Sequence, residues 1–117
     1  MRAPYALVAS VLSLACAPVS AQATPTRACG KVGGYIVRSD QRTTTCGLAR
    51  NAARNFLAGF GALGHAPRYI HGHSPKTGLT YRLRRATAAV RLTGSTYTYV
   101  GRTGQARLFV WLRYPMY

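Results

Sequence analysis

The stretch TTTCGLARNAARNFLAGFGALG, residues 43–64, contains the most regular pattern of the chain and decides its fold. Apolar residues recur in it at intervals of three and four, the spacing that places side chains on one face of an α-helix. They are Ala49, Ala52, Ala53, Phe56, Leu57 and Phe60. The threonines before Cys46 can cap the helix start, and Gly59, Gly61 and Gly64 can end it. We therefore predict an amphipathic helix that begins near Cys46.

The segments on either side of this stretch are typical of β-strands. Residues 35–38, with the sequence YIVR, are expected to form a first strand before the helix. Residues 79–84 and 88–92 alternate apolar with polar side chains, and a break is expected between them near Arg85. The remaining strand candidates are residues 68–73, 97–100 and 106–113, with a turn at 101–104. We predict an α+β fold in which one N-terminal amphipathic helix packs on a four- to five-stranded antiparallel sheet.

Residues 1–23 have the composition of a signal peptide. Arg2 is followed by an uncharged apolar run over residues 5–17 and then by small residues, so cleavage is expected after Ala21 or after Ala23. The apolar run is too short to anchor the chain across a bilayer. We therefore predict a secreted or extracytoplasmic protein.

Residues 24–117 are predicted to form a single small α+β domain with one disulfide. Cys16 would leave with the signal peptide, or would be the acylated residue if the protein were instead a lipoprotein. Cys29 and Cys46 remain as a pair in an oxidising compartment, where a bond between them would contribute about 3 kcal/mol. Free or metal-bound thiols are the alternative, and no CxxC spacing supports it.

The charge of the chain is strongly positive. It has 16 lysines and arginines against one acid, Asp40, and a formal net charge of +15. Loss of Arg2 with the signal peptide would lower this by one, to +14. Such an excess favours anionic partners, which include nucleic acid and cell-envelope polymers, and charge alone does not choose among them. Because most of the basic residues are arginine, a GC-rich coding bias is the alternative explanation.

A single carboxylate limits the classes of enzyme. Glycosidase chemistry with paired carboxylates is excluded by the count, and a Ser-His-Asp triad would have to use Asp40, which lies in a predicted turn. The chain has no GxGxxG, P-loop or HExxH motif, so no cofactor is predicted.

Three short motifs are spread over the chain after residue 24. They are Cys29-Gly30 before a short strand, CGLARNAAR at residues 46–54, and SPKTGLTY at residues 74–81. Together they resemble small exported bacterial α+β proteins from GC-rich organisms, a group without an assigned activity. The resemblance implies export and a disulfide. It does not imply any particular catalytic or binding activity. The chain departs from the group because it has no cysteine after Cys46.

The segment HGHSPKTGLTY, which begins at His71, contains two histidines one residue apart. On a strand, His71 and His73 would project to the same face and could bind a metal if His65 or Asp40 supplied a third ligand. They could also act as acid and base beside Lys76 in metal-independent RNA cleavage. Because no closer ligand or carboxylate is present, we predict no metal site and interpret both histidines as half-exposed strand residues.

The following five residues, SPKTG at positions 74–78, differ by one letter from a cell-wall sorting pentapeptide. A sorting signal must lie near the C-terminus, whereas residues 79–117 follow this one. Proline fixes φ at the second position of a turn and glycine allows a left-handed corner, so we predict a turn between two strands.

The outward face of the predicted sheet is the most extended candidate site. If the alternating apolar residues of the strands face the helix, their neighbours share the opposite face. These neighbours are Arg82, Arg84, Arg91, Arg107, Phe109, Trp111 and Arg113. Cationic side chains interleaved with aromatic rings can bind a single-stranded polyanion or stack on sugars. The apolar run 108–112 leaves an alternative, a strand buried on both faces.

These observations predict a small, secreted, strongly basic, non-enzymatic protein that binds anionic polymers or the cell envelope. The predicted ligand-binding residues are Arg82, Arg84, Arg91, Arg107 and Trp111. The alternative is a secreted metal-independent ribonuclease that uses His71, His73 and Lys76. The sequence makes no prediction of oligomeric state.

Overall fold

The structure is a computed structural model that describes residues 25–104 and 106–115. The predicted signal peptide and Cys16 lie outside these residues. The described elements are β1 (Thr26–Val32), β2 (Tyr35–Asp40), α2 (Cys46–Leu63), β3 (Tyr69–His73), β4 (Thr80–Arg91), β5 (Gly94–Thr103) and β6 (Ala106–Pro115).

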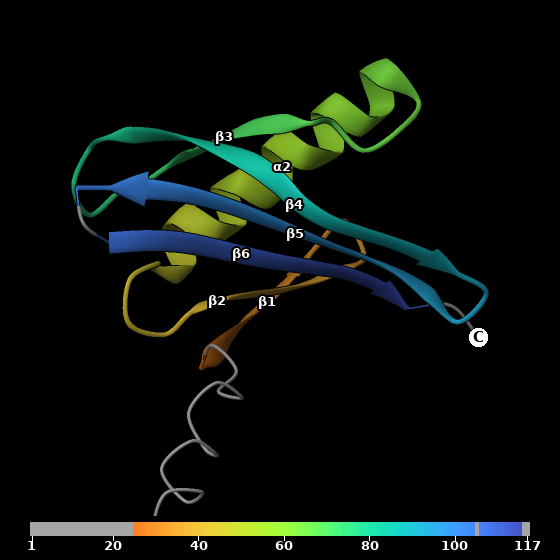
Figure 1. The fold of residues 1–117 in the computed structure, drawn as a ribbon, viewed down its shortest axis with the longest axis horizontal. Coiled ribbons are helices and arrows are strands. Elements are labelled where there is room, and N and C mark those ends of the chain that lie inside the picture. The colour runs from red at the N-terminus through yellow and green to blue at the C-terminus, as the bar shows by residue number, and fades with distance from the viewer. Residues whose placement is uncertain (1–24, 105, 116–117) are drawn as a thin grey trace, which may run out of the picture.

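The strands form one antiparallel sheet in the order β1-β2-β6-β5-β4-β3, and the sheet curls into a half-barrel (Figure 1). Helix α2 lies against one face and contacts both edge strands, β3 and β1, so the sheet wraps around the helix. The α+β class with one helix on an antiparallel sheet is confirmed for the described residues. The expected four to five strands were wrong, because the sheet has six.

Helix α2 begins and ends as its sequence indicates. The side chain of Thr45 caps the start by accepting a hydrogen bond from the Leu48 amide. The helix continues through Gly59 and Gly61 and ends at Gly64, whose φ of 79° allows its amide to bond the Phe60 carbonyl at 2.8 Å. Its buried face consists of Leu48, Ala49, Ala52, Ala53 and Phe56.

The core lies between this helical face and the inner face of the sheet. Phe56 is fully buried, and its ring packs near the rings of Tyr35, Phe60, Tyr97 and Tyr99, with centroids 5.2–5.8 Å apart. The other large buried side chains are Val37, Leu83, Leu108, Val110 and Leu112. One aromatic cluster at the helix centre therefore holds the two layers together.

Tyr99 places a polar group inside this core and satisfies it. Its side chain is fully buried, and its hydroxyl donates to the Pro67 carbonyl at 2.5 Å. Burial raises the pKa of Tyr99 to about 12, against the smaller opposing effect of Arg85. The phenol therefore stays protonated and keeps this bond at any ordinary pH.

Strand β1 was not expected, because the first strand candidate in the sequence was residues 35–38. Gly33 and Gly34, with φ of 57° and 84°, form a two-residue turn that joins β1 to β2. The predicted disulfide is confirmed: it joins Cys29 of β1 to Cys46 in the first turn of α2. The edge strand is thus linked covalently to the helix.

The break expected near Arg85 was wrong, since β4 runs without interruption from Thr80 to Arg91. A register shift between Arg85 and Thr87 marks a β-bulge instead. The bulge moves the inward-facing set from odd positions such as Leu83 to even positions such as Ala88, which lies opposite the buried Tyr97. This shift explains why the apolar pattern changes phase along a single strand.

Three apolar residues expected to face the helix are exposed and do not belong to the core. Leu79 precedes β4 and is 56% exposed, Val90 is 73% exposed, and Leu92 in the β4–β5 turn is 94% exposed. The hairpin turn lies beyond the part of the sheet that α2 covers (Figure 1).

The edge of β3 is covered by two asparagines of the helix. The side-chain amide of Asn55 donates to the His71 carbonyl at 2.7 Å, and the side-chain oxygen of Asn51 accepts from the His73 amide at 2.8 Å. Asn55 also donates to Asn51 at 3.2 Å. These amides occupy the bonding positions that a further strand would use, and so protect the edge from pairing with another chain.

Candidate functional site

The seven side chains assigned to the outward face do lie on the helix-free face of the sheet. Their chain neighbours Leu83, Leu108, Val110 and Leu112 are buried against the helix, so the alternating residues point the other way. On β6 this places Arg107, Phe109, Trp111 and Arg113 in one line. The alternative of a strand buried on both faces does not hold, because Phe109 and Trp111 are partly exposed.

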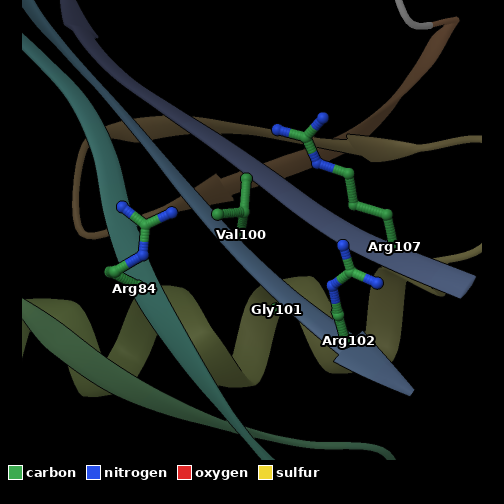
Figure 2. A pocket seen from close by; sticks show the side chains of 5 residues that line it. All are labelled: Arg84, Val100, Gly101, Arg102 and Arg107. Carbon is green, nitrogen blue, oxygen red and sulfur yellow. The ribbon is translucent and has the colours of Figure 1, made fainter. Parts of the chain in front are cut away.

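Two of these side chains, Arg84 and Arg107, border a hollow in that face together with residues of β5. Figure 2 shows Arg84 from β4, Val100 and Arg102 from β5, and Arg107 from β6, with their side chains projecting to the side opposite α2. The hollow has a volume of about 360 Å³. Arg102 lies opposite Arg107 in the register, and Val100 lies opposite Arg84 on one side and Phe109 on the other. A short side chain between three long cationic ones therefore forms the floor.

The arginines of the chain fall into two groups by their hydrogen bonds. The first group donates to protein oxygens, and consists of Arg27, Arg38, Arg50, Arg85 and Arg113. In contrast, the guanidinium groups of Arg84, Arg102 and Arg107 donate no hydrogen bond to any residue that the structure describes. The same holds for five arginines outside the hollow, which are Arg42, Arg54, Arg68, Arg82 and Arg91. The arginines of the hollow are therefore not used to stabilise the fold in the described part of the chain.

No carboxylate lines the hollow to balance this charge. The single acid, Asp40, is at the end of β2, the strand next to β6, and it is not among the residues that line the hollow. Its carboxylate accepts from the Arg42 amide at 2.8 Å. Three neighbouring guanidinium groups with no acid among them repel one another, and an anion placed between them would relieve that repulsion.

The cationic surface continues from the hollow toward β3. Arg84 also borders an adjacent hollow of about 490 Å³, together with Arg68 and Tyr69. The guanidinium of Arg82 lies 3.9 Å from the centre of the Tyr69 ring, a cation–π contact. Arg82 and Tyr69 therefore support each other at the edge of this surface.

Arg91 was predicted to act with the other arginines, and the structure places it apart from them. It lies at the far end of β4 opposite Gly94, about 20 Å along the strand from Arg84. Arg102 was not predicted, although it lines the hollow. The predicted turn began at Gly101, whereas β5 continues to Thr103 and so places Arg102 on the helix-free face.

His71 and His73 share the helix-free face, as expected for alternate residues of a strand. His71 lies opposite Arg82 and His73 opposite Thr80, whose hydroxyl is 3.0 Å from His73 Nδ1. Lys76 is exposed in the predicted turn, which is closed by a 2.8 Å bond from the Gly78 amide to the Ser74 carbonyl.

The suggested third metal ligands are not near these histidines. His65 follows the helix and lines a hollow with Phe60 and Tyr97 on the helix side. Asp40 is on β2, which is separated from β3 by the strands β6, β5 and β4. Among the residues that the structure describes, no group of three metal-binding side chains is found.

Comparisons with known proteins do not identify this site. The chain matches no protein-family model, no curated protein and no solved structure. The resemblance to small exported bacterial proteins therefore stays a prediction. In the described part of the chain, no helix has the length and apolar character needed to cross a membrane.

Proposed function

We propose that this is a small extracytoplasmic protein, without enzymatic activity, that binds anionic polymers through the helix-free face of its sheet. The main supporting observation is the hollow between Arg84, Arg102 and Arg107, whose guanidinium groups have no acceptor among the described residues. Export is supported by the disulfide, since such bonds persist in oxidising compartments.

The placement of the arginines supports this function better than net charge alone. If the charge arose only from coding bias, the arginines would have no reason to gather on one face. In this chain the arginines that bond to the protein lie outside the hollow, whereas those of the hollow point into solvent. Long side chains fixed on three adjacent strands also lose less freedom on binding than chains on a mobile loop.

Replacing Arg84, Arg102 and Arg107 together with glutamine is expected to weaken binding to inorganic polyphosphate about tenfold or more at moderate salt. Each arginine that contacts a phosphate releases counterions, so the dependence of log K on log salt should become less steep by about two to three. The measurement is the affinity over a salt series, with circular dichroism to verify that the variant is folded.

A matched variant separates a specific face from general charge. Replacing Lys31, Arg42 and Arg54 with glutamine removes the same three charges from exposed positions that do not line the hollow. This control should retain most of the affinity and the salt dependence. If both triple variants lose the same affinity, or if the native protein does not bind polyphosphate, the proposed site is wrong.

A metal-independent ribonuclease is the second candidate, and one observation favours it. His71 and His73 lie on the same face as the hollow, and His71 is opposite Arg82 on the neighbouring strand. An acid, a base and a cation near a phosphate are the groups that such cleavage needs. However, the single carboxylate of the chain is too far away to orient either imidazole.

Incubation of the protein with RNA in the presence of a chelator distinguishes the two functions. We expect the RNA to remain intact. The binding proposal would be wrong if the RNA is cleaved, if cleavage is lost when His71 is replaced with alanine, and if it is kept when the distant His65 is replaced in the same way. The protein would then be a nuclease.

A further inference from the structure

We propose that the anionic polymer is a single-stranded nucleic acid, with its bases stacked on Phe109 and Trp111 and a phosphate held in the neighbouring arginine hollow. This inference rests on the proposed binding function and names its partner. It comes from the line of side chains on β6, in which two aromatic rings stand between Arg107 and Arg113.

The two rings have no structural task on this face that explains them. The inner face of the same strand supplies Leu108, Val110 and Leu112 to the core, and these are fully buried. Phe109 and Trp111 point the other way and remain partly exposed, although β6 lies between β2 and β5 in the middle of the sheet. No helix or strand of the described residues covers them.

On the β5 side, the neighbours of the rings are short side chains. Phe109 lies opposite Val100, and Trp111 lies opposite Thr98. Both of these neighbours are smaller than a ring, so the aromatic side chains rise above the surface on that side. On the β2 side Trp111 lies opposite Arg38, whose guanidinium donates to Thr26 Oγ1 of β1 at 2.9 Å. Alternate residues of a strand are about 7 Å apart, which leaves room for one base on each ring once the bases are unstacked from each other.

The phosphate site adjoins this platform directly. Val100, which forms the floor of the hollow, is the cross-strand neighbour of Phe109, and Arg107 precedes Phe109 on the same face of β6. Guanidinium groups bind phosphate oxygens through paired hydrogen bonds. A strand with one base on Phe109 could therefore place its adjoining phosphate among Arg84, Arg102 and Arg107.

The combination of rings and cations selects among polyanions. A polyol-phosphate polymer would use the arginines and leave both rings without a partner. A duplex would hide the faces of its bases in its own stack. Bases of a single strand have exposed π-faces, and stacking on aromatic side chains accepts any base.

Fluorescence of Trp111 gives a direct test, because it is the only tryptophan of the chain. The native protein would be titrated with an oligodeoxythymidylate and with an abasic oligomer that has the same number of phosphates. We expect the oligodeoxythymidylate to bind about tenfold more tightly and to quench Trp111, because each stacked base adds affinity. The abasic oligomer should bind with little quenching.

Two matched variants assign the effect to the platform. Replacing Phe109 with leucine should reduce the preference for bases while leaving affinity for the abasic oligomer nearly unchanged. Replacing Phe60 with leucine makes the same change at a partly buried ring on the helix side and should keep the preference. Thermal unfolding of both variants verifies that each is folded.

Each other outcome overturns the inference in a recognisable way. Equal affinity for both oligomers would indicate that the protein binds phosphate groups and does not recognise bases. Nucleic acid would then not be its specific ligand. Tighter binding to a uronic-acid polymer than to the oligodeoxythymidylate would indicate sugars on the rings. Failure to bind any of these polymers, or polyphosphate, would overturn the proposed function as well.

Discussion

Replacing Phe56 with alanine is expected to lower the free energy of unfolding by about 3–5 kcal/mol. A domain of this size has a total stability on the order of 5–15 kcal/mol, so the variant would lose a large fraction of it. The expected loss is larger than that of any single surface change, because Phe56 is at the centre of the only packed layer in the described residues.

The size of this effect follows from the surroundings of the ring. Phe56 is 0% exposed and packs near the rings of Tyr35, Phe60, Tyr97 and Tyr99. Rings cannot collapse into the space that a missing ring leaves, because the helix and the sheet fix their positions. A cavity would therefore remain and add to the lost transfer free energy.

The measurement is chemical denaturation followed by circular dichroism. Replacing Leu63 with alanine is the matched control, because this residue is on the same helix and is 55% exposed. That variant should lose no more than about 0.5 kcal/mol. If the two variants are destabilised equally, Phe56 is not the centre of the core.

The helix was predictable because its apolar residues follow a single period over about three turns, from Ala49 to Phe60, and the helix has a capping residue at each end. Thr45 and Gly64 occupy these cap positions in the structure. The six-stranded sheet was predicted less well. In β1 the only buried residue is Cys29, so no apolar alternation marks it as a strand. The signal that could have found it is Gly33-Gly34, a two-residue hairpin turn between two short runs.

The outward face could be predicted from period two alone, because alternate residues of a strand always share a side. The sequence does not predict which residues are close together on that face, because their distances depend on the register of the strands. Arg91 belongs to the same face as Arg84 and lies at the other end of it. Arg102 was missed because Gly101 resembled the start of a turn. In the structure Thr103 pairs with Ala106, so the turn is shorter and Arg102 lies within the strand.

Removing the disulfide by replacing both Cys29 and Cys46 with alanine is expected to destabilise the protein by about 3 kcal/mol. The bond spans 17 residues of sequence, and without it the unfolded chain gains the freedom of that loop. Alanine is preferred to serine because Cys29 is buried, and a serine hydroxyl there would need a hydrogen-bond partner.

The loss should also be uneven across the sheet. Strand β1 is an edge strand that pairs only with β2, and apart from the disulfide its link to the helix includes the 3.1 Å bond from Arg50 to the Cys29 carbonyl. In the double variant we expect amide hydrogen exchange to accelerate first in β1, while β5 and β6, paired on both sides, keep their protection.

Reduction of the native protein gives an independent measurement of how much the disulfide contributes to stability. Its unfolding midpoint in a thiol reductant should fall to nearly that of the double alanine variant, because both remove the same constraint. Titration of the free thiols verifies that the protein is reduced. If the reduced protein then unfolds at the same midpoint as the oxidised protein, β1 is held by its backbone pairing with β2. In that case the bond between Cys29 and Cys46 would be dispensable for the stability of the fold.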